Sequence, residues 1–140
     1  MNWLHWSLLS ATFAAVTAIL AKIGVSGVDP NMATAIRTSV IVVFTWTIAF
    51  MGRSSSTRIP ASGRTWLFLG LSGVATGLSW LCYFRALQLG PASRVAPVDK
   101  LSVVLVIVLA AVILDERLTA MKITGGALIA LGAVLLAIEQ

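Results

Sequence analysis

The stretch Leu101–Leu114 has the sequence LSVVLVIVLAAVIL and contains no charged side chain. With the residues before it, it forms the mostly apolar segment Val95–Leu114. A helix that crosses a bilayer needs about 20 mostly apolar residues, and this segment has that length. A strand of an outer-membrane barrel would instead alternate apolar and polar residues over about 10 positions. The segment therefore predicts a transmembrane helix.

Four other segments of the chain have the same apolar character and a similar length. They are Trp3–Ile23, Met32–Met51, Thr65–Leu89 and Ala120–Ile138. The connections between the segments are too short to hold a soluble domain. Glycine, which often ends a helix because it accepts the left-handed conformation, follows three of the five segments, at Gly24, Gly52 and Gly90. The sequence thus predicts an all-α integral membrane protein, a bundle of five transmembrane helices forming one domain over residues 1–140.

The overall composition excludes most soluble classes. Hydrophobic residues make up 59% of the 140 residues and charged residues only 11%, against roughly 25% charged in an average soluble domain. The net charge is +5, but the ten basic residues are scattered without a basic run, so we expect no nucleic-acid partner. Cys82 is the single cysteine and has no intrachain disulfide partner. We expect a multi-pass protein of a cell membrane of the bacterial inner-membrane type.

Charged residues inside the spans need a physical reason, because each costs about 2.5–3.5 kcal/mol on insertion scales. Lys22 and Arg85 lie near segment ends, where a long side chain can extend to the headgroups. Arg37 lies deeper in the second segment. It is the better candidate for a functional charge, in contact with a small-molecule substrate.

The third segment carries a stripe of hydroxyl residues on an otherwise apolar helix, at intervals of four, three and four: Ser72, Thr76, Ser79 and Tyr83. Lipid offers hydroxyl groups no partners, so the stripe is expected to face the bundle interior or a wet cavity together with Arg37. Trp80 and Phe84 adjoin the stripe and could line the same space. The predicted substrate-binding residues are Arg37, Ser72, Thr76, Ser79, Trp80 and Tyr83.

A second polar group lies at the start of the fourth segment. Proline suits a first helical turn, so the helix is expected to begin within a turn of Pro97 or to kink there. Asp99 would then lie near the free amides of that turn, where the helix dipole favours an acid. Alternatively Asp99 pairs with Arg94 or Lys100, and these three residues form an entrance to a substrate path.

No catalytic arrangement is present in the sequence. His5 is the only histidine, and it has no acid or cysteine at motif spacing. No phosphate-binding loop and no metal-binding motif occurs. We therefore expect a protein that is not an enzyme and that uses no cofactor and no metal.

From Tyr83 onward the sequence resembles the EamA-type repeat of the drug/metabolite transporter superfamily. The first two segments match that repeat in hydropathy and size, and the turn after the third segment is the most specific part. The matching text is YFRAL at Tyr83–Leu87, GPASRVAPV at Gly90–Val98 and ERLT at Glu116–Thr119, with Leu101, Gly125, Gly126, Leu128, Ile129 and Gly132 beyond or between.

Most members of that family carry two five-helix repeats in inverted orientation, whereas this chain has one. The resemblance implies a bundle whose first four helices surround a central path, with the fifth more peripheral. It also implies an exporter of a small metabolite or drug, driven by an ion gradient or by exchange. The alternative is a non-transporting membrane subunit that needs a different partner chain.

One repeat supplies only half of a symmetric transport path, so we expect a homodimer. Five spans place the two termini on opposite sides of the membrane. An excess of Lys and Arg on one side sets orientation, and equal counts would favour an antiparallel pair. The N-terminal side holds Arg53, Arg58, Arg64, Arg117 and Lys122, and the other side holds Lys22, Arg37, Arg85, Arg94 and Lys100. Without the intramembrane Arg37 and Arg85 the balance is five to three, which favours the N-terminus inside.

Overall fold

A computed structural model describes residues 2–52 and 62–138, so Arg53 and Arg58 lie outside the described residues. Within these ranges the chain contains helices and no strand. The helices are α1 (Trp3–Gly24), α2 (Pro30–Met51), α3 (Gly63–Leu89), α4 (Ala92–Asp99), α5 (Leu101–Ile113) and α6 (Ala120–Ile138). Five spans are long and apolar enough to cross a membrane, because α4 and α5 together form the span Ala92–Ile113. The predicted all-α fold with five transmembrane helices is confirmed.

The helix ends follow local hydrogen-bonding chemistry. The Asp29 carboxylate accepts hydrogen bonds from the amides of Asn31 and Met32, which is the standard N-cap arrangement. Pro30 is the first residue of α2, a position where its missing N–H costs nothing. The helix therefore begins two residues earlier than the sequence suggested.

The expected left-handed glycine stops are wrong. Gly24 is the last residue of α1, and Gly52 has a φ of −83°, with its amide bonded back to the Ile48 carbonyl as in a continuing helix. Among the described glycines the positive φ belongs to Gly27, at 75° in the loop between α1 and α2. The chain thus uses the freedom of glycine in the turn, after the helix has already ended.

The fourth span is interrupted at Lys100, three residues after Pro97. Pro97 cannot donate to the carbonyl four residues before it, and the Lys100 amide bonds to the Pro97 carbonyl in a tighter turn. The predicted kink is confirmed. The predicted place of Asp99 at the free amides of a first turn is wrong, because α4 begins at Ala92 and Asp99 is its last residue. Pro91 is the N-cap of that helix, and its carbonyl accepts hydrogen bonds from the amides of Arg94 and Val95.

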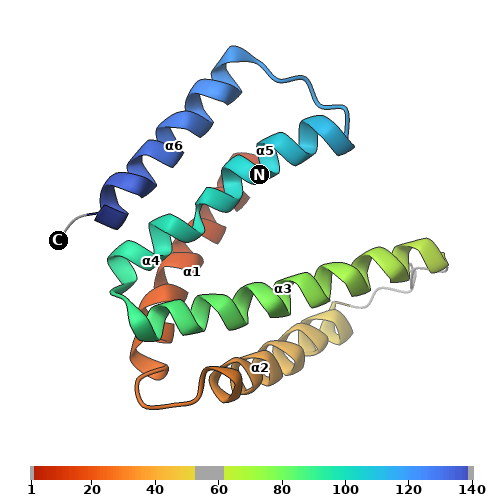
Figure 1. Ribbon diagram of the computed structural model, residues 1–140. Coiled ribbons are helices and arrows are strands. Elements are labelled where there is room, and N and C mark those ends of the chain that lie inside the picture. The colour runs from red at the N-terminus through yellow and green to blue at the C-terminus, as the bar shows by residue number, and fades with distance from the viewer. Residues whose placement is uncertain (1, 53–61, 139–140) are drawn as a thin grey trace. The chain divides into compact units, whose positions relative to one another are not determined.

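The chain divides into two compact units, each described here by itself. The first unit comprises the described parts of residues 1–22 and 89–140, and the second comprises those of residues 23–88. In the first unit α6 packs against α4 and α5 (Figure 1). Gly126 and Ala133 of α6 are buried, and a Cβ on Gly126 would lie 3.4 Å from Ile107 Cδ1. A small residue thus permits the close approach of α5 and α6.

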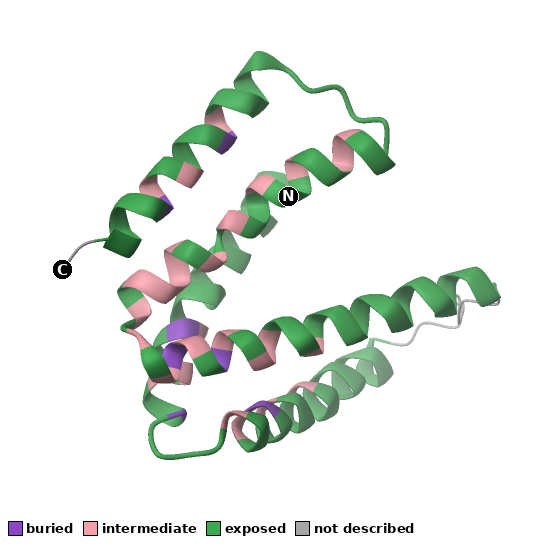
Figure 2. Cartoon of the chain, in the orientation of Figure 1, coloured by how far each residue is buried: buried purple, intermediate pink, exposed green. Residues whose placement is uncertain are grey.

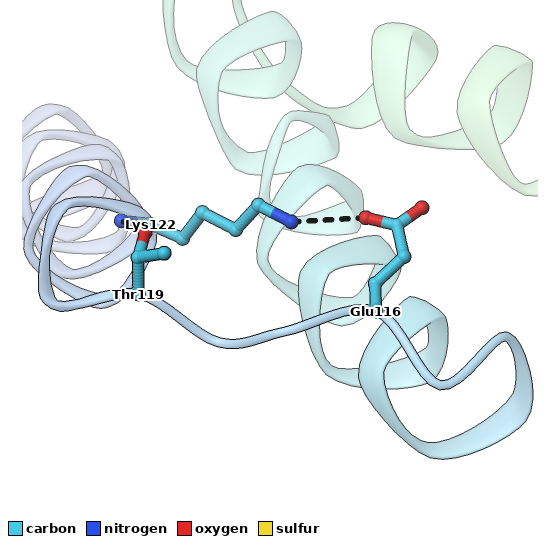
Figure 3. Close-up of polar contacts among 3 residues, drawn as sticks. All are labelled: Glu116, Thr119 and Lys122. Atoms are coloured by element: carbon cyan, nitrogen blue, oxygen red, sulfur yellow. Dashed lines mark hydrogen bonds and ion pairs between the residues drawn. The ribbon is translucent and has the colours of Figure 1, made fainter.

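The turn before α6 is built from polar contacts (Figure 3). The Lys122 amide donates to Thr119 Oγ1 over 3.3 Å, so Thr119 is the N-cap of α6. Lys122 Nζ also pairs with Glu116 Oε2 at 2.9 Å. Asp115 adopts a φ of 54°, and the following Glu116 amide bonds to the Ala110 carbonyl at the end of α5. These contacts satisfy backbone groups that both helix ends would otherwise leave open.

Most large apolar side chains on the helices are exposed (Figure 2). Trp3 is 78% exposed, Met51 84% and Met121 85%. A soluble monomer does not expose contiguous apolar surface on this scale, whereas lipid covers such a surface without cost. The exposure therefore agrees with a membrane protein.

Candidate functional site

Arg37 lies in the second unit, on α2, against aromatic rings of α3. Its Cζ atom is 4.2 Å from the centroid of the Trp80 ring and 5.6 Å from that of Phe84. A guanidinium over an aromatic face is attracted by the ring quadrupole, by about 0.5–1 kcal/mol when exposed and about 2 kcal/mol when desolvated. This attraction offsets part of the cost of placing a cation in a span. The structure thus brings together two of the predicted substrate-binding residues, Arg37 and Trp80.

The end of α3 holds the loop before α2 in place. Gln88 Nε2 donates to the backbone carbonyls of Val25 and Val28, and its Oε1 accepts from Arg85 Nη1 at 3.2 Å. Asp29 then starts α2 directly after this loop. Polar contacts around Gln88 therefore help to set how far along α3 the start of α2 lies, and with it Arg37. Gln88 was not among the residues predicted from the sequence. An amide in the last turn of an apolar helix was the available signal.

In the hydroxyl stripe on α3, Thr76 finds its hydrogen-bond partner within the helix and not in a cavity. Thr76 Oγ1 donates to the Ser72 carbonyl at 2.9 Å, a bond within the helix that needs no cavity. Ser72, Thr76 and Ser79 are exposed, and Tyr83 is half-buried. The premise that membrane hydroxyls lack partners is therefore wrong for Thr76. Its hydroxyl alone does not require a wet surrounding.

A groove of about 540 Å³ lies between α2 and α3 within the second unit. Its polar lining comes from α2, and Gly77 and Leu81 of α3 complete it. The lining residues of α2 are Asn31, Thr34, Ala35, Thr38, Ser39, Val42 and Val43. None of the predicted substrate-binding residues is among them. The spacing of three and four residues from Asn31 through Thr34 to Thr38 was a signal for this polar face that the sequence analysis missed.

The predicted entrance residues lie in the first unit, at the interruption between α4 and α5. Lys100 Nζ pairs with Asp99 Oδ2 at 3.2 Å. Both side chains are partly exposed, so the pair contributes little to stability. Of the two partners considered for Asp99, Lys100 is the one it contacts, and Arg94 lies half-buried on the same short helix.

Lys22 also makes a specific contact in the first unit. Its Nζ donates to the Gly90 carbonyl over 2.8 Å, just past the end of α3. A cation is favoured where a helix leaves its last carbonyls unsatisfied. Within residues 2–52 and 62–138 no cluster of three or more His, Cys, Asp or Glu side chains could hold a metal ion.

Comparison with known proteins identifies the family. Residues 1–138 match the model of the EamA-like transporter family. A protein of a Sinorhizobium species, described as an uncharacterized transporter in the cobO 3' region, is 53% identical over 139 residues, which cover 98% of this chain and 97% of that protein. No solved structure matches the chain. With five apolar spans and a family model that matches almost its whole length, the chain belongs to the EamA-like transporter family.

Proposed function

We propose that this chain is a secondary transporter, an exporter of a small metabolite or drug, and that it works as a homodimer of five-helix halves. The observation that carries the proposal is Arg37, a cation placed within a span and held there by the rings of Trp80 and Phe84. An intramembrane charge is expensive. A purely structural subunit would have no need of it.

The proposed substrate-binding residues belong to α2 and α3 of the second unit. Arg37 and Trp80 form the binding centre, and the exposed hydroxyls of Ser72, Thr76 and Ser79 with Tyr83 line it on the adjoining face of α3. For the first unit, we propose that Arg94, Asp99 and Lys100, at the interrupted fourth span, are entrance residues of a substrate path. Interrupted helices are a recurrent feature of transporter binding sites, because they free backbone groups and helix ends for ions and substrates.

The number of spans supports the proposed dimer. The family model is matched once along the chain, and five spans provide one half of a path with alternating access. A second copy, inserted in the opposite orientation, would supply the other half. The competing proposal is a non-transporting subunit that requires a different partner chain. It differs in one outcome, because it predicts no flux from this chain alone.

Tracer counterflow tests the proposal. The purified chain is reconstituted alone into liposomes, which are loaded with an unlabelled metabolite pool and then given labelled members of that pool outside. We expect transient uptake of at least one labelled compound, and its strong reduction in Arg37→Gln but not in Arg64→Gln. Absence of counterflow for every compound, together with its appearance after adding a second chain, would support the subunit instead.

A further inference from the structure

We propose that the substrate is a small organic anion and that the guanidinium of Arg37 binds its carboxylate or phosphate group. This inference rests on the proposed transport function and adds the chemical class of the substrate. It follows from three features of the second unit: the unused hydrogen-bond donors of Arg37, the lack of a counter-charge, and the depth of the guanidinium.

The hydrogen-bond donors of Arg37 are unused. A guanidinium presents five N–H donors in a planar fork that fits two oxygens of a carboxylate or phosphate. In residues 2–52 and 62–138 Arg37 contacts the rings of Trp80 and Phe84 and bonds to no oxygen. The rings hold the charge but leave the fork without an acceptor. An oxyanion would complete it.

The second unit offers Arg37 no compensating charge. Its one described acid is Asp29, and that carboxylate accepts from the amides of Asn31 and Met32 at the start of α2. Eight residues of helix separate Asp29 from Arg37, a rise of about 12 Å. The net positive charge beside Trp80 would repel a cationic substrate and attract an anionic one.

The depth of the guanidinium separates a substrate from a lipid phosphate. Arg37 lies seven residues beyond Pro30, about 10 Å along the helix. An arginine that reaches for the headgroups would direct its guanidinium toward that helix end. Instead it lies closer to Trp80 than to Phe84, and Trp80 is the ring farther from the end of α3, by about 6 Å. The charge is therefore held inside the span.

The aromatic side of the site suits the organic part of such a molecule. Trp80 is half-buried, so part of its ring can contact a ligand next to the charge, whereas Phe84, at 4% exposure, is covered. Ligand sites commonly combine an apolar surface with a few well-placed polar groups. A carboxylate on a compact apolar body fits both features.

Ligand-induced stabilisation of the purified full chain in an uncharged detergent tests the inference. The probes are benzoate, phenyl phosphate and inorganic phosphate, with benzamide as the neutral equivalent and benzylammonium as the cation. We expect the anions to raise the unfolding temperature of the wild type and benzamide and benzylammonium to leave it unchanged. Apparent affinity should fall by about 10- to 100-fold in Arg37→Gln.

Three comparisons keep the result interpretable. Arg64→Gln is the matched control, since Arg64 also lies over a ring, 5.7 Å from Phe68, but at the start of α3. Arg37→Lys keeps the charge but loses the planar fork, and should bind the anions with intermediate affinity. It also serves if Arg37→Gln does not fold. Phosphatidylglycerol added to the same detergent shows whether a lipid phosphate takes the site.

The outcomes are distinct. Equal stabilisation by benzoate and benzamide, or equal anion affinity in wild type and Arg37→Gln, would overturn the inference. Stabilisation by phosphatidylglycerol through Arg37, with no response to the soluble anions, would also overturn it and assign Arg37 to lipid. If none of the anions binds while counterflow of a neutral or cationic compound persists, the substrate class is wrong and transport stands. Absence of counterflow for every compound in the wild type would instead contradict the proposed function itself.

Discussion

Replacing Gln88 by leucine should destabilise the protein by about 1.5 kcal/mol. The Gln88 amide donates to two backbone carbonyls of the α1–α2 loop, those of Val25 and Val28. The partly buried bond to Val25 contributes about 1 kcal/mol net and the exposed bond to Val28 about 0.5 kcal/mol. The bond from Arg85 to Gln88 is exposed and should add less than about 0.5 kcal/mol.

The free energy of unfolding can be measured for each variant by circular dichroism during titration of mixed micelles with a denaturing detergent. Arg85→Ala is the control, because it removes the exposed bond and keeps both bonds to the loop. It should lose less than about 0.5 kcal/mol. A loss in Arg85→Ala as large as that in Gln88→Leu would refute the reasoning, and so would a Gln88→Leu variant as stable as the wild type.

Three further substitutions, two of them with a matched control variant, test the packing and the cap of α6 by the same unfolding titration. Leu87→Ala should cost about 2–5 kcal/mol, since Leu87 is 0% exposed, whereas Leu89→Ala, at a residue 75% exposed, should cost under about 1 kcal/mol; equal losses would contradict the burial. Gly126→Leu should cost about 1–3 kcal/mol by forcing Ile107 aside, and Gly132→Leu, where a Cβ meets nothing within 4 Å, should be tolerated. Thr119→Ala should cost about 1 kcal/mol and speed amide exchange at Lys122; unchanged exchange there would rule out the cap.

The number and approximate positions of the spans could be predicted from the sequence because hydropathy alone determines them. A run such as Leu101–Leu114 cannot be accommodated in water or in a barrel, and its helical form follows. The ends were less predictable. They depend on individual caps, and Asp29 extends α2 by two residues while Gly52 ends it without a left-handed residue.

The candidate site was predictable in part. The cost of an intramembrane cation marked Arg37, and helical spacing placed Trp80 and Phe84 near the hydroxyl stripe. What could not be predicted was the pairing of helices, which decides that the Arg37 guanidinium lies over Trp80. The groove lined by α2 hydroxyls was missed for the same reason, because its far wall comes from Gly77 and Leu81 of another helix.

The interruption at Lys100 shows a different limit. Pro97 correctly predicted a kink, but the same proline was also assigned to a first helical turn. The structure starts the helix at Ala92, so Pro97 is internal and Asp99 ends the short helix α4. The sequence placed the irregularity within one turn of Pro97. It could not decide on which side of the proline the helix begins.

The most direct test of the central claim, that one chain supplies half of a transport path, is flux measured against protein density. Liposomes are prepared from many chains per vesicle down to fewer than one on average, and counterflow is recorded for each preparation. The account predicts that the active fraction follows the statistics of vesicles holding two or more chains, and therefore falls as the square of density at high dilution. A fall in direct proportion to density would show that a single chain transports alone, and would contradict the account.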